Sequence, residues 1–416
     1  LASTILFTIV LLMLQDDLSR LFELRDHPEY ITWMIGILFF DTLGVLPLAK
    51  LRLEERPRKY AFVNVAAILL NIGLVIFFLF IARGMQQAKP NSIWSVIYQP
   101  DVGVGYFIIA NLIASAVSLL FLYKEFSAFR WLFDRKMWAE VLIYSYPLVI
   151  VGFGGMINEM LSRVMYRKVL DLDPAVEKRD LGIFGANYKL AVLITIFIQI
   201  FRLAAEPFFF NQSARDDARK TYARVMKFFV IACCFMFLFV ALFLDVWGEL
   251  IGVRFEEYKE GLHIVPILAM ASVFLGIYYN LSIWYKLTNK TMYGAYITIA
   301  GALVTILLNF WWIPLFRYTG AAWATFVCYA FMMVVSYLQG QKYYAIPYAW
   351  KKLLAYLVIV SLLYLVQWGI SWLTPDWAIF HLFTGVILLG IFTAFLLKIE
   401  KREFSRLPLI GRFIRI

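Results

Sequence analysis

Hydrophobic residues occur in long runs along this chain, and short polar stretches separate each run from the next. About twelve runs approach the length of a membrane-spanning helix, which requires roughly 17 to 25 mainly apolar residues. We therefore expect an all-α polytopic membrane protein. The runs cover approximately residues 1–14, 30–50, 60–83, 105–123, 142–168, 182–203, 228–247, 263–285, 293–313, 319–338, 350–373 and 377–397.

The composition supports a location in the membrane. Of 416 residues, 62% are hydrophobic, 18% are aromatic and only 16% are charged. A soluble fold of this size could not bury so much apolar surface. The net charge of +11 could suggest a nucleic-acid partner, but the basic residues punctuate apolar runs instead of clustering on a soluble face. We expect membrane lipids as neighbours and no nucleic acid.

Motifs of catalytic and metal-binding proteins are missing from the sequence. The longest polar interruption, residues 84–104, is about 20 residues long and is too short for a soluble catalytic domain. The chain has no P-loop, and its three histidines and three cysteines have neither the H-E-x-x-H pattern nor the spacing of a zinc site. We therefore expect no enzymatic activity, no cofactor and no metal site.

The distribution of lysine and arginine predicts the orientation in the membrane. Short loops rich in these residues remain in the cytoplasm. When the loops are sorted alternately, about 26 basic residues fall on one side and about 11 on the other, and two lie within spans. The richer side includes residues 398–416, so we expect a cytoplasmic C-terminus and a bacterial inner-membrane location.

Four charged residues lie inside the predicted spans, and they are the candidate functional residues. A charge at the centre of a span costs about 2.5 to 3.5 kcal/mol unless a partner or a water-filled cavity compensates it. Asp41 lies midway along the second run. Glu159 and Arg163 are one turn apart on one helix face beside Asn158. Lys189 lies about 11 Å from the outer end of the next helix.

Two interpretations of these charges remain open. In the first, Arg163 and Lys189 face a shared cavity and attract an anionic headgroup such as a pyrophosphate, while Asp41 and Glu159 serve as counter-charges or proton acceptors. In the second, Glu159 and Arg163 neutralise each other, and Lys189 extends to the interface or pairs with Asp41 only to hold the helices together. In the first interpretation the polar lining of the cavity also includes Asn158, Asn187 and Tyr188.

Four stretches of the sequence resemble a known family. They are PLAKLRLEERPRKYAFVNV, DLGIFGANYKLAVLITIFIQIFRLAAEPFFF, GIYYNLSIWYKLTNKTMYGAYITIAGALVTILLN and GAAWATFVCYAFMMVVSYLQGQKYY. They are similar to the oligosaccharide flippases (Wzx-like polysaccharide biosynthesis proteins) of Bacteroidetes-type bacteria. This family is a branch of the multidrug/oligosaccharidyl-lipid/polysaccharide (MOP) exporter superfamily, which includes the MATE drug exporters.

The resemblance implies a MATE-like helix bundle of fourteen helices in two six-helix lobes, followed by two added helices. The twelve runs would be helices three to fourteen, and two helices would precede them. Residues 1–125 would then be the rest of the first lobe, 140–345 the second lobe, and 346–416 the added helices with a basic tail. The cavity between the lobes would have Asp41 on the first lobe and Lys189 on the second.

The family also implies a function and partners. Its members carry undecaprenyl-pyrophosphate-linked oligosaccharides from the cytoplasmic to the periplasmic leaflet by alternating access, driven by an H⁺ or Na⁺ gradient. We expect a monomer that associates with glycan polymerase machinery. Three alternatives remain: a MATE-type drug/cation antiporter, which would favour a cavity dominated by carboxylates, a lipid II flippase, which differs only in cargo, and a membrane glycan polymerase or ligase, against which the short outer loops argue.

Overall fold

The computed structural model is entirely helical in the residues that it describes, and no β-strand occurs among them. The described residues are those outside 1, 22–23, 25, 55, 90–91, 128–133, 171–172, 254, 376 and 405–416, and the side chains of 2, 21, 127, 157–159, 163, 167–168, 402 and 404 are also left out. The chain divides into two compact units, Leu1–Phe133 and Asp134–Ile416, each of which is described by itself.

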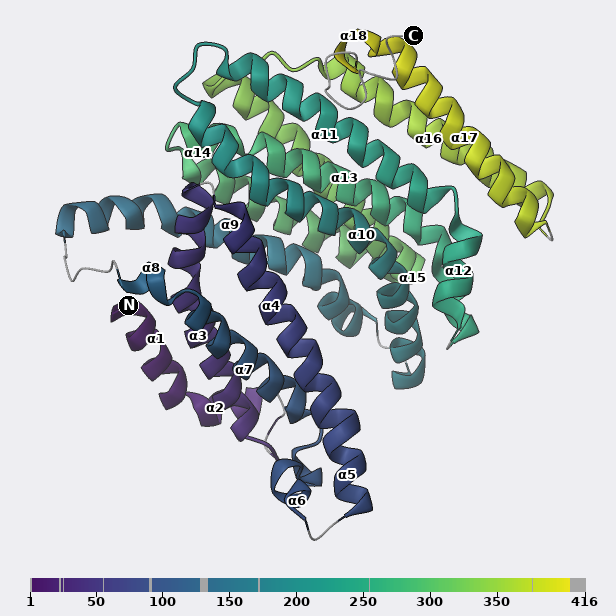
Figure 1. Cartoon of the computed structure of the whole chain (residues 1–416). Helices are drawn as coiled ribbons and strands as arrows, with labels where there is room; N and C mark the ends of the chain where they lie inside the picture. The colour runs from purple at the N-terminus through teal and green to yellow at the C-terminus, as the bar shows by residue number, and fades with distance from the viewer. Residues whose placement is uncertain are drawn as a thin grey trace. The chain divides into compact units, whose positions relative to one another are not determined.

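The first unit packs three long helices together (Figure 1). Helix α7 lies against both α3 and α4, and α1 lies against α3. Helix α4 continues through a π-helical turn, η1, into α5, so that the three form one helix of 32 residues. The elements are α1 (Ala2–Met13), α2 (Gln15–Leu21), α3 (Glu29–Leu53), α4 (Pro57–Ile76), η1 (Phe77–Ala82), α5 (Arg83–Ala88), α6 (Trp94–Ile97), η2 (Pro100–Val102), α7 (Gly105–Phe121) and α8 (Tyr123–Ser127).

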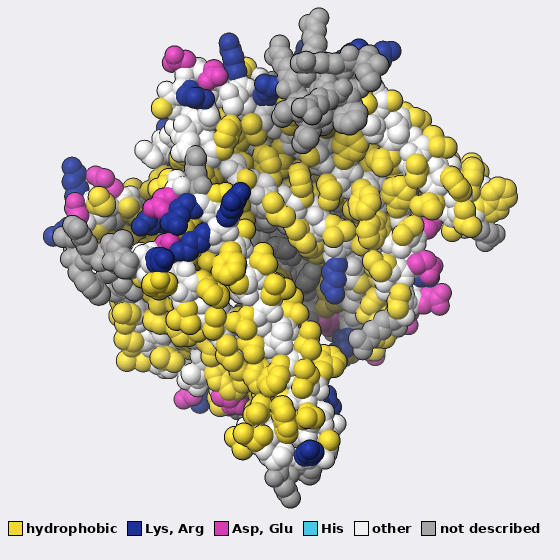
Figure 2. All heavy atoms as spheres, viewed as in Figure 1, with side chains coloured by type: hydrophobic (Ala, Val, Ile, Leu, Met, Phe, Trp, Pro, Cys, Tyr) yellow, Lys and Arg dark blue, Asp and Glu magenta, His cyan; other side chains and the backbone are white. Residues whose placement is uncertain are grey.

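A buried carboxylate joins the basic end of α3 and α4 to α8. The side chain of Glu125 is 3% exposed, and Lys59 Nζ donates to both of its oxygens at 2.7 and 2.8 Å. Arg56 lies 3.7 Å from the same carboxylate. Burial alone would raise the pKa of Glu125, but the hydrogen bond from Lys59, a backbone hydrogen bond and the charges of Lys59 and Arg56 together lower it. Basic side chains gather on the surface near this end of α3 and α4 (Figure 2).

The second unit is larger and contains two layers of long helices and a terminal hairpin. Helix α9 lies along α15, and α13 packs against α10, α11 and α15. Helices α16 and α17 pair with each other and contact α11 (Figure 1). The elements are α9 (Arg135–Val169), α10 (Pro174–Gln212), α11 (Ala218–Ala241), α12 (Leu244–Gly252), η3 (Glu256–Ile264), α13 (Val265–Leu281), α14 (Ile283–Leu287), α15 (Thr291–Tyr343), α16 (Trp350–Leu373), α17 (Ala378–Ile399) and α18 (Lys401–Phe404).

Helix α15 contains two of the predicted spans, because the chain reverses within it at Arg317. This residue has φ 52° and ψ −133°, which is rare for any residue other than glycine. Its guanidinium Nη2 lies 2.5 Å from Oδ2 of Asp180, which is 1% exposed and also accepts a hydrogen bond from Tyr166. A Cβ atom at Gly320 would lie 2.4 Å from the carbonyl oxygen of Trp312, so the tight turn needs glycine there.

A second buried carboxylate attaches the terminal hairpin to the rest of the unit. Glu400, at the end of α17, has a side chain that is 3% exposed. Its oxygens accept hydrogen bonds from Lys227 of α11 at 2.9 Å, Lys352 of α16 at 3.1 Å and Tyr356 of α16 at 2.7 Å. Burial alone would raise the pKa of Glu400, but these three donors lower it. One carboxylate therefore joins three helices at the same end.

Large apolar side chains cover the outward faces of the helices, as expected for contact with lipid (Figure 2). Among the described residues, nine helices are long and apolar enough to cross a membrane, and two shorter apolar helices cover Ser3–Met13 and Gly105–Phe121. The predicted all-α membrane fold is confirmed. The count of twelve spans and the lobe boundaries at 140–345 and 346–416 stay predictions.

Candidate functional site

The second unit contains a polar cavity of about 460 Å³ between α9, α10, α13, α14 and α15. It is large enough for a small polar headgroup, since ligand pockets commonly enclose about 300 to 1,000 Å³. Helix α10 contributes two of the charged residues and α14 the third, α13 and α14 contribute most of the aromatic ones, and α9 contributes glycines. The lining residues are Leu148, Val151, Gly152, Gly155, Met156, Gln199, Arg202, Glu206, Leu275, Tyr278, Tyr279, Ser282, Tyr285, Lys286, Thr298, Tyr329 and Met332.

Glycines on α9 leave the space that the cavity occupies. Gly152 and Gly155 line it, and a Cβ atom at Gly152 would meet no atom within 4 Å. Gly154 has a different role, because a Cβ atom there would lie 2.4 Å from Cγ2 of Thr298. This glycine therefore allows α9 and α15 to approach closely, while its neighbours keep one side of the cavity free of side chains.

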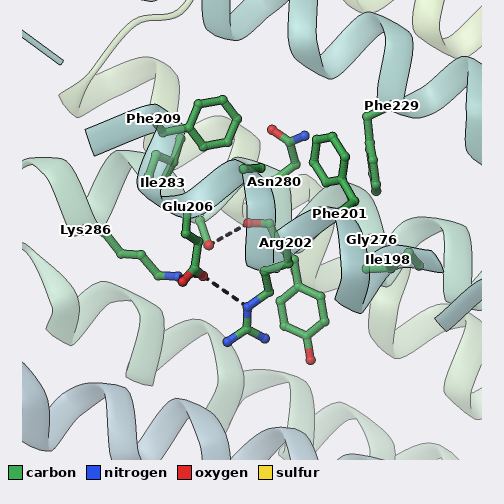
Figure 3. A pocket seen from close by; sticks show the side chains of 13 residues that line it. Ile198, Phe201, Arg202, Glu206, Phe209, Phe229, Gly276, Asn280, Ile283 and Lys286 are labelled. Carbon is green, nitrogen blue, oxygen red and sulfur yellow. Dashed lines mark hydrogen bonds and ion pairs between the residues drawn. The ribbon is translucent and has the colours of Figure 1, made fainter. Parts of the chain in front are cut away.

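Three charged residues meet in the cavity (Figure 3). Arg202 and Glu206 are one turn apart on α10, and Arg202 Nε donates to Glu206 Oε1 at 3.0 Å. Lys286, from α14, approaches from the other side and donates to the same oxygen at 2.5 Å. The side chains are 40% exposed for Arg202, 35% for Glu206 and 12% for Lys286. Two cations therefore share one carboxylate, which gives the group one net positive charge.

Aromatic rings surround the cations. The guanidinium carbon of Arg202 lies 4.9 Å from the ring centre of Tyr279, which is within the range of a cation–π interaction. Tyr278, also on α13, is 1% exposed, and its hydroxyl lies 3.2 Å from the hydroxyl of Thr298. The tyrosine thus helps to hold α13 against α15. The cavity consequently combines cationic donors with ring faces and hydroxyl groups.

An apolar floor lies behind the charged group and excludes water from one side of it. A pocket of only about 10 Å³ separates the charges from the core, which is room for one water molecule at most. Because this floor has a low dielectric constant, the charges interact more strongly than they would in water. The residues of the floor labelled in Figure 3 are the apolar Ile198, Phe201, Phe209, Phe229, Gly276 and Ile283, together with one polar residue, Asn280.

Lys189 lies elsewhere on α10. It is exposed, and none of the described residues forms an ion pair or a hydrogen bond with it. Thirteen residues, or about 20 Å of helix, separate it from Arg202. Ile196 and Ile200 share its face of α10 and are 52% and 63% exposed. This face is therefore not covered by the described part of the second unit, and Lys189 does not line the 460 Å³ cavity.

Asn187 and Tyr188 also lie outside the cavity. Asn187 is fully buried, and its Nδ2 donates to the carbonyl oxygens of Ile183 at 2.9 Å and of Tyr258 at 2.8 Å. It therefore connects α10 to η3 in the packed interior of the unit, and its expected place in a polar lining stays a prediction. Tyr188 is half-buried and lies beside Phe184, with 5.9 Å between the ring centres.

The other predicted residues cannot be placed beside this cavity. The side chains of Asn158, Glu159 and Arg163 lie outside the described part of the structure. Their neighbour Ser162 is buried and accepts a hydrogen bond from Asn309 of α15 at 3.0 Å. Asp41 is an exposed residue of α3 in the first unit, and none of the described residues pairs with it.

Sequence reasoning missed Arg202, Glu206 and Lys286 because it assigned the two cations to loops. Helix α10 extends to Gln212, which is beyond the predicted end of the span at residue 203. The spacing of Arg202 and Glu206 by four residues was a local indication of an ion pair on a helix. Lys286 gave no such indication, because only the fold brings it to a residue 80 positions earlier.

Comparisons with known proteins agree with the helical architecture. The MatE family model matches residues 176–311. No curated protein sequence was found that matches the chain. Similar solved structures include an aspartate-to-asparagine mutant of the Vibrio cholerae MATE transporter VcmN, with a TM-score of 0.61 and 14% identity. They also include the bent form of that transporter, with a TM-score of 0.59 and 14% identity. Each comparison covers 82% of this chain and 76% of the other.

The third similar structure is the lipid II flippase MurJ in an inward closed conformation. It has a TM-score of 0.55 and 16% identity, and the comparison covers 95% of this chain and 83% of that one. These identities are low, so the likeness concerns the fold. The MATE-like fold expected from the sequence is confirmed.

Proposed function

We propose that the chain is a flippase that moves an undecaprenyl-pyrophosphate-linked oligosaccharide from the cytoplasmic to the periplasmic leaflet by alternating access. The observation that carries the proposal is the cavity in which Arg202 and Lys286 outnumber Glu206, the single carboxylate among the described residues that line it. The MATE-like fold is compatible with this function. The chain then performs no covalent chemistry, and an H⁺ or Na⁺ gradient supplies the energy.

The chemistry of the cavity suits both polar parts of such a cargo. A pyrophosphate spreads its negative charge over several oxygens, so a guanidinium and an ammonium can bind it together. Sugar rings have apolar faces that pack against tyrosine rings and hydroxyl groups that bond to tyrosine and serine. Tyr279, Tyr285, Tyr329 and Ser282 provide these groups in the lining. The isoprenoid tail remains in the lipid along the apolar exterior.

A MATE-type drug/cation antiporter is the nearest alternative on the same fold. A cationic drug requires an excess of carboxylates, whereas the described charges of this cavity add up to one positive charge. A lipid II flippase would use the same cations, because lipid II also carries a pyrophosphate. The two flippases therefore differ in how the tyrosines and the remaining lining accommodate the sugar.

We also propose a location and an orientation for the protein. In an inner membrane with the C-terminus in the cytoplasm, Glu206 and Lys286 lie at the cytoplasmic ends of their helices. The cavity would then receive the cargo on the side where lipid-linked oligosaccharides are assembled. We propose that the protein acts as a monomer. Association with a glycan polymerase on the other side remains part of the proposal.

The proposal is tested by transport in proteoliposomes that contain only this protein. Three cargos are supplied: an isoprenyl-pyrophosphate-linked oligosaccharide, lipid II and a cationic dye. We expect the first to reach the opposite leaflet, measured by its accessibility to an impermeant glycosidase. Transport of the dye alone would instead assign the chain to the drug antiporters. Transport of lipid II in preference to the oligosaccharide would assign it to the lipid II flippases.

The predicted roles of Lys189 and Arg163 give a separate prediction. If both residues bind the pyrophosphate during transport, Lys189→Gln and Arg163→Gln should abolish the display of surface glycan while the protein stays inserted and abundant. The reason is that loss of a cation weakens binding of the anion without leaving a buried charge unpaired. Glycan display and membrane abundance are measured together. A variant that disappears from the membrane would favour the purely structural interpretation.

A further inference from the structure

The hydrogen bonds of Glu206 are unequally distributed between its two oxygens. Oε1 accepts from both Arg202 and Lys286, whereas Oε2 has no partner among the described residues. Arg202 uses only its Nε, and its Nη1 and Nη2 atoms have no hydrogen-bond partner in the described part of the chain. The Tyr279 ring holds the guanidinium in place. A fork of two donors is therefore available to a further anion.

The arrangement of donors around Oε1 resembles what a phosphate oxygen requires. Arginine binds phosphate best through two parallel N–H donors, and lysine binds it as a point charge. Lys286 is only 12% exposed, so its ammonium group needs an anion beside it at all times. Glu206 provides this anion when the cavity has no ligand. Its carboxylate occupies the position that one anionic oxygen of a ligand would take.

We propose that Glu206 is a displaceable internal anion, which releases Lys286 and Arg202 to a phosphate group of the cargo and takes up one proton as it does so. This inference rests on the proposed flippase function. The proton comes from bulk water and forms an O–H bond on the Glu206 carboxylate, and no bond of the cargo changes. Uptake follows because a carboxylate without its cations is costly beside an apolar floor. Binding of cargo and of the proton therefore favour each other.

The other groups around Glu206 do not account for such an uptake. Tyr144 of α9 lies within electrostatic reach of Glu206. Tyr279 and Tyr285 come from α13 and α14, and Tyr329 comes from α15. Tyrosine ordinarily titrates near pH 10, and lysine and arginine titrate still higher. Among the described lining residues, Glu206 is thus the group that can take up a proton between pH 5.5 and pH 8 when an anion binds.

The inference is tested by measuring binding to the full chain in lipid nanodiscs between pH 5.5 and pH 8. The probe is an isoprenyl diphosphate esterified with one sugar, because its two phosphates keep a constant charge over this range. For the unmodified chain we expect affinity to rise as the pH falls, by up to about tenfold per pH unit for one linked proton. For Glu206→Gln we expect affinity to be about tenfold higher at pH 8 and independent of pH.

A matched control is Glu249→Gln, which removes an exposed carboxylate that pairs with Lys259 at 2.7 Å outside the cavity. It should keep both the affinity and the pH dependence of the unmodified chain. If neither the unmodified chain nor Glu206→Gln binds the probe at any pH, the flippase proposal fails. If the probe binds but Glu206→Gln retains the pH dependence, or binds more weakly, the displacement of Glu206 is overturned.

Calorimetry of the unmodified chain decides the question even if Glu206→Gln does not fold. Binding of the probe is measured at one pH in two buffers with different ionisation enthalpies. The difference in heat gives the number of protons taken up per probe bound. We expect uptake of up to one proton per probe bound, because Glu206 is charged before binding. Binding without proton uptake at every pH would overturn the inference.

Discussion

Replacing Arg202 by glutamine is expected to reduce binding of a pyrophosphate-linked lipid by about 100-fold and to stop its transport. The variant loses the two free Nη donors of Arg202. Glu206 is then held by Lys286 alone, so it competes more strongly with the cargo for that lysine. Loss of one partner of a desolvated charged contact costs about 2 to 5 kcal/mol, and each 1.4 kcal/mol corresponds to about tenfold in affinity. Binding is measured in nanodiscs and transport in proteoliposomes.

Two further variants separate this role from a general loss of positive charge. Arg202→Lys keeps the charge but not the fork, so it should retain part of the affinity. Arg179→Gln removes an arginine from the same helix, where it pairs with Glu257 and Glu260 outside the cavity. It should bind and transport like the unmodified chain. Normal binding by an abundant and folded Arg202→Gln protein would refute the assignment of the site.

The hydrophobic runs predicted where helices lie but not where they end. The length of a run of apolar residues reflects the thickness of the lipid. A helix can continue beyond the lipid into water, provided that the free backbone groups at its ends have hydrogen-bond partners. Helix α10 shows this, because it begins at Pro174, eight residues before the predicted span. The side chain of Asp173 caps it by accepting a hydrogen bond from the amide of Ala175 at 2.8 Å. The Asp-Pro pair was the local indication of this earlier start.

The charged site was less predictable than the helices, for a physical reason. A charge inside an apolar run is conspicuous because it is costly, and this drew attention to Lys189 and Asp41. The residues that the structure brings together lie near helix ends, where a charge costs little and is common. Only the packing of α14 against α10 turns Lys286 and Glu206 into a pair. A contact between such distant residues has no signature in either local sequence.

Removing the carboxylate of Glu400 is expected to have the largest effect on stability. In Glu400→Gln, Tyr356 keeps a polar neighbour. Lys227, which is 13% exposed, keeps Glu403 at 3.2 Å but loses the buried carboxylate that lies 2.9 Å from it. Breaking a buried ion pair by removing one partner costs about 3 to 5 kcal/mol, and partial exposure of Lys352 places the value near the lower limit. Thermal unfolding in detergent should therefore occur at a lower temperature, with α16 and α17 cleaved first by protease.

The same carboxylate predicts how stability changes with pH. The pKa of Glu400 is lower in the folded chain than its ordinary value, because Lys227, Tyr356 and Lys352 donate to it in spite of its burial. Its contribution is therefore fully present above the ordinary glutamate pKa of about 4.3, and it is lost as the pH falls through the lower folded value. Glu400→Gln should remove this part of the acid sensitivity. Glu249→Gln, whose carboxylate is 79% exposed, should change stability by about 1 kcal/mol at most. Equal effects of the two substitutions would contradict a specific role for Glu400 in attaching the terminal hairpin, since only its carboxylate contacts three helices.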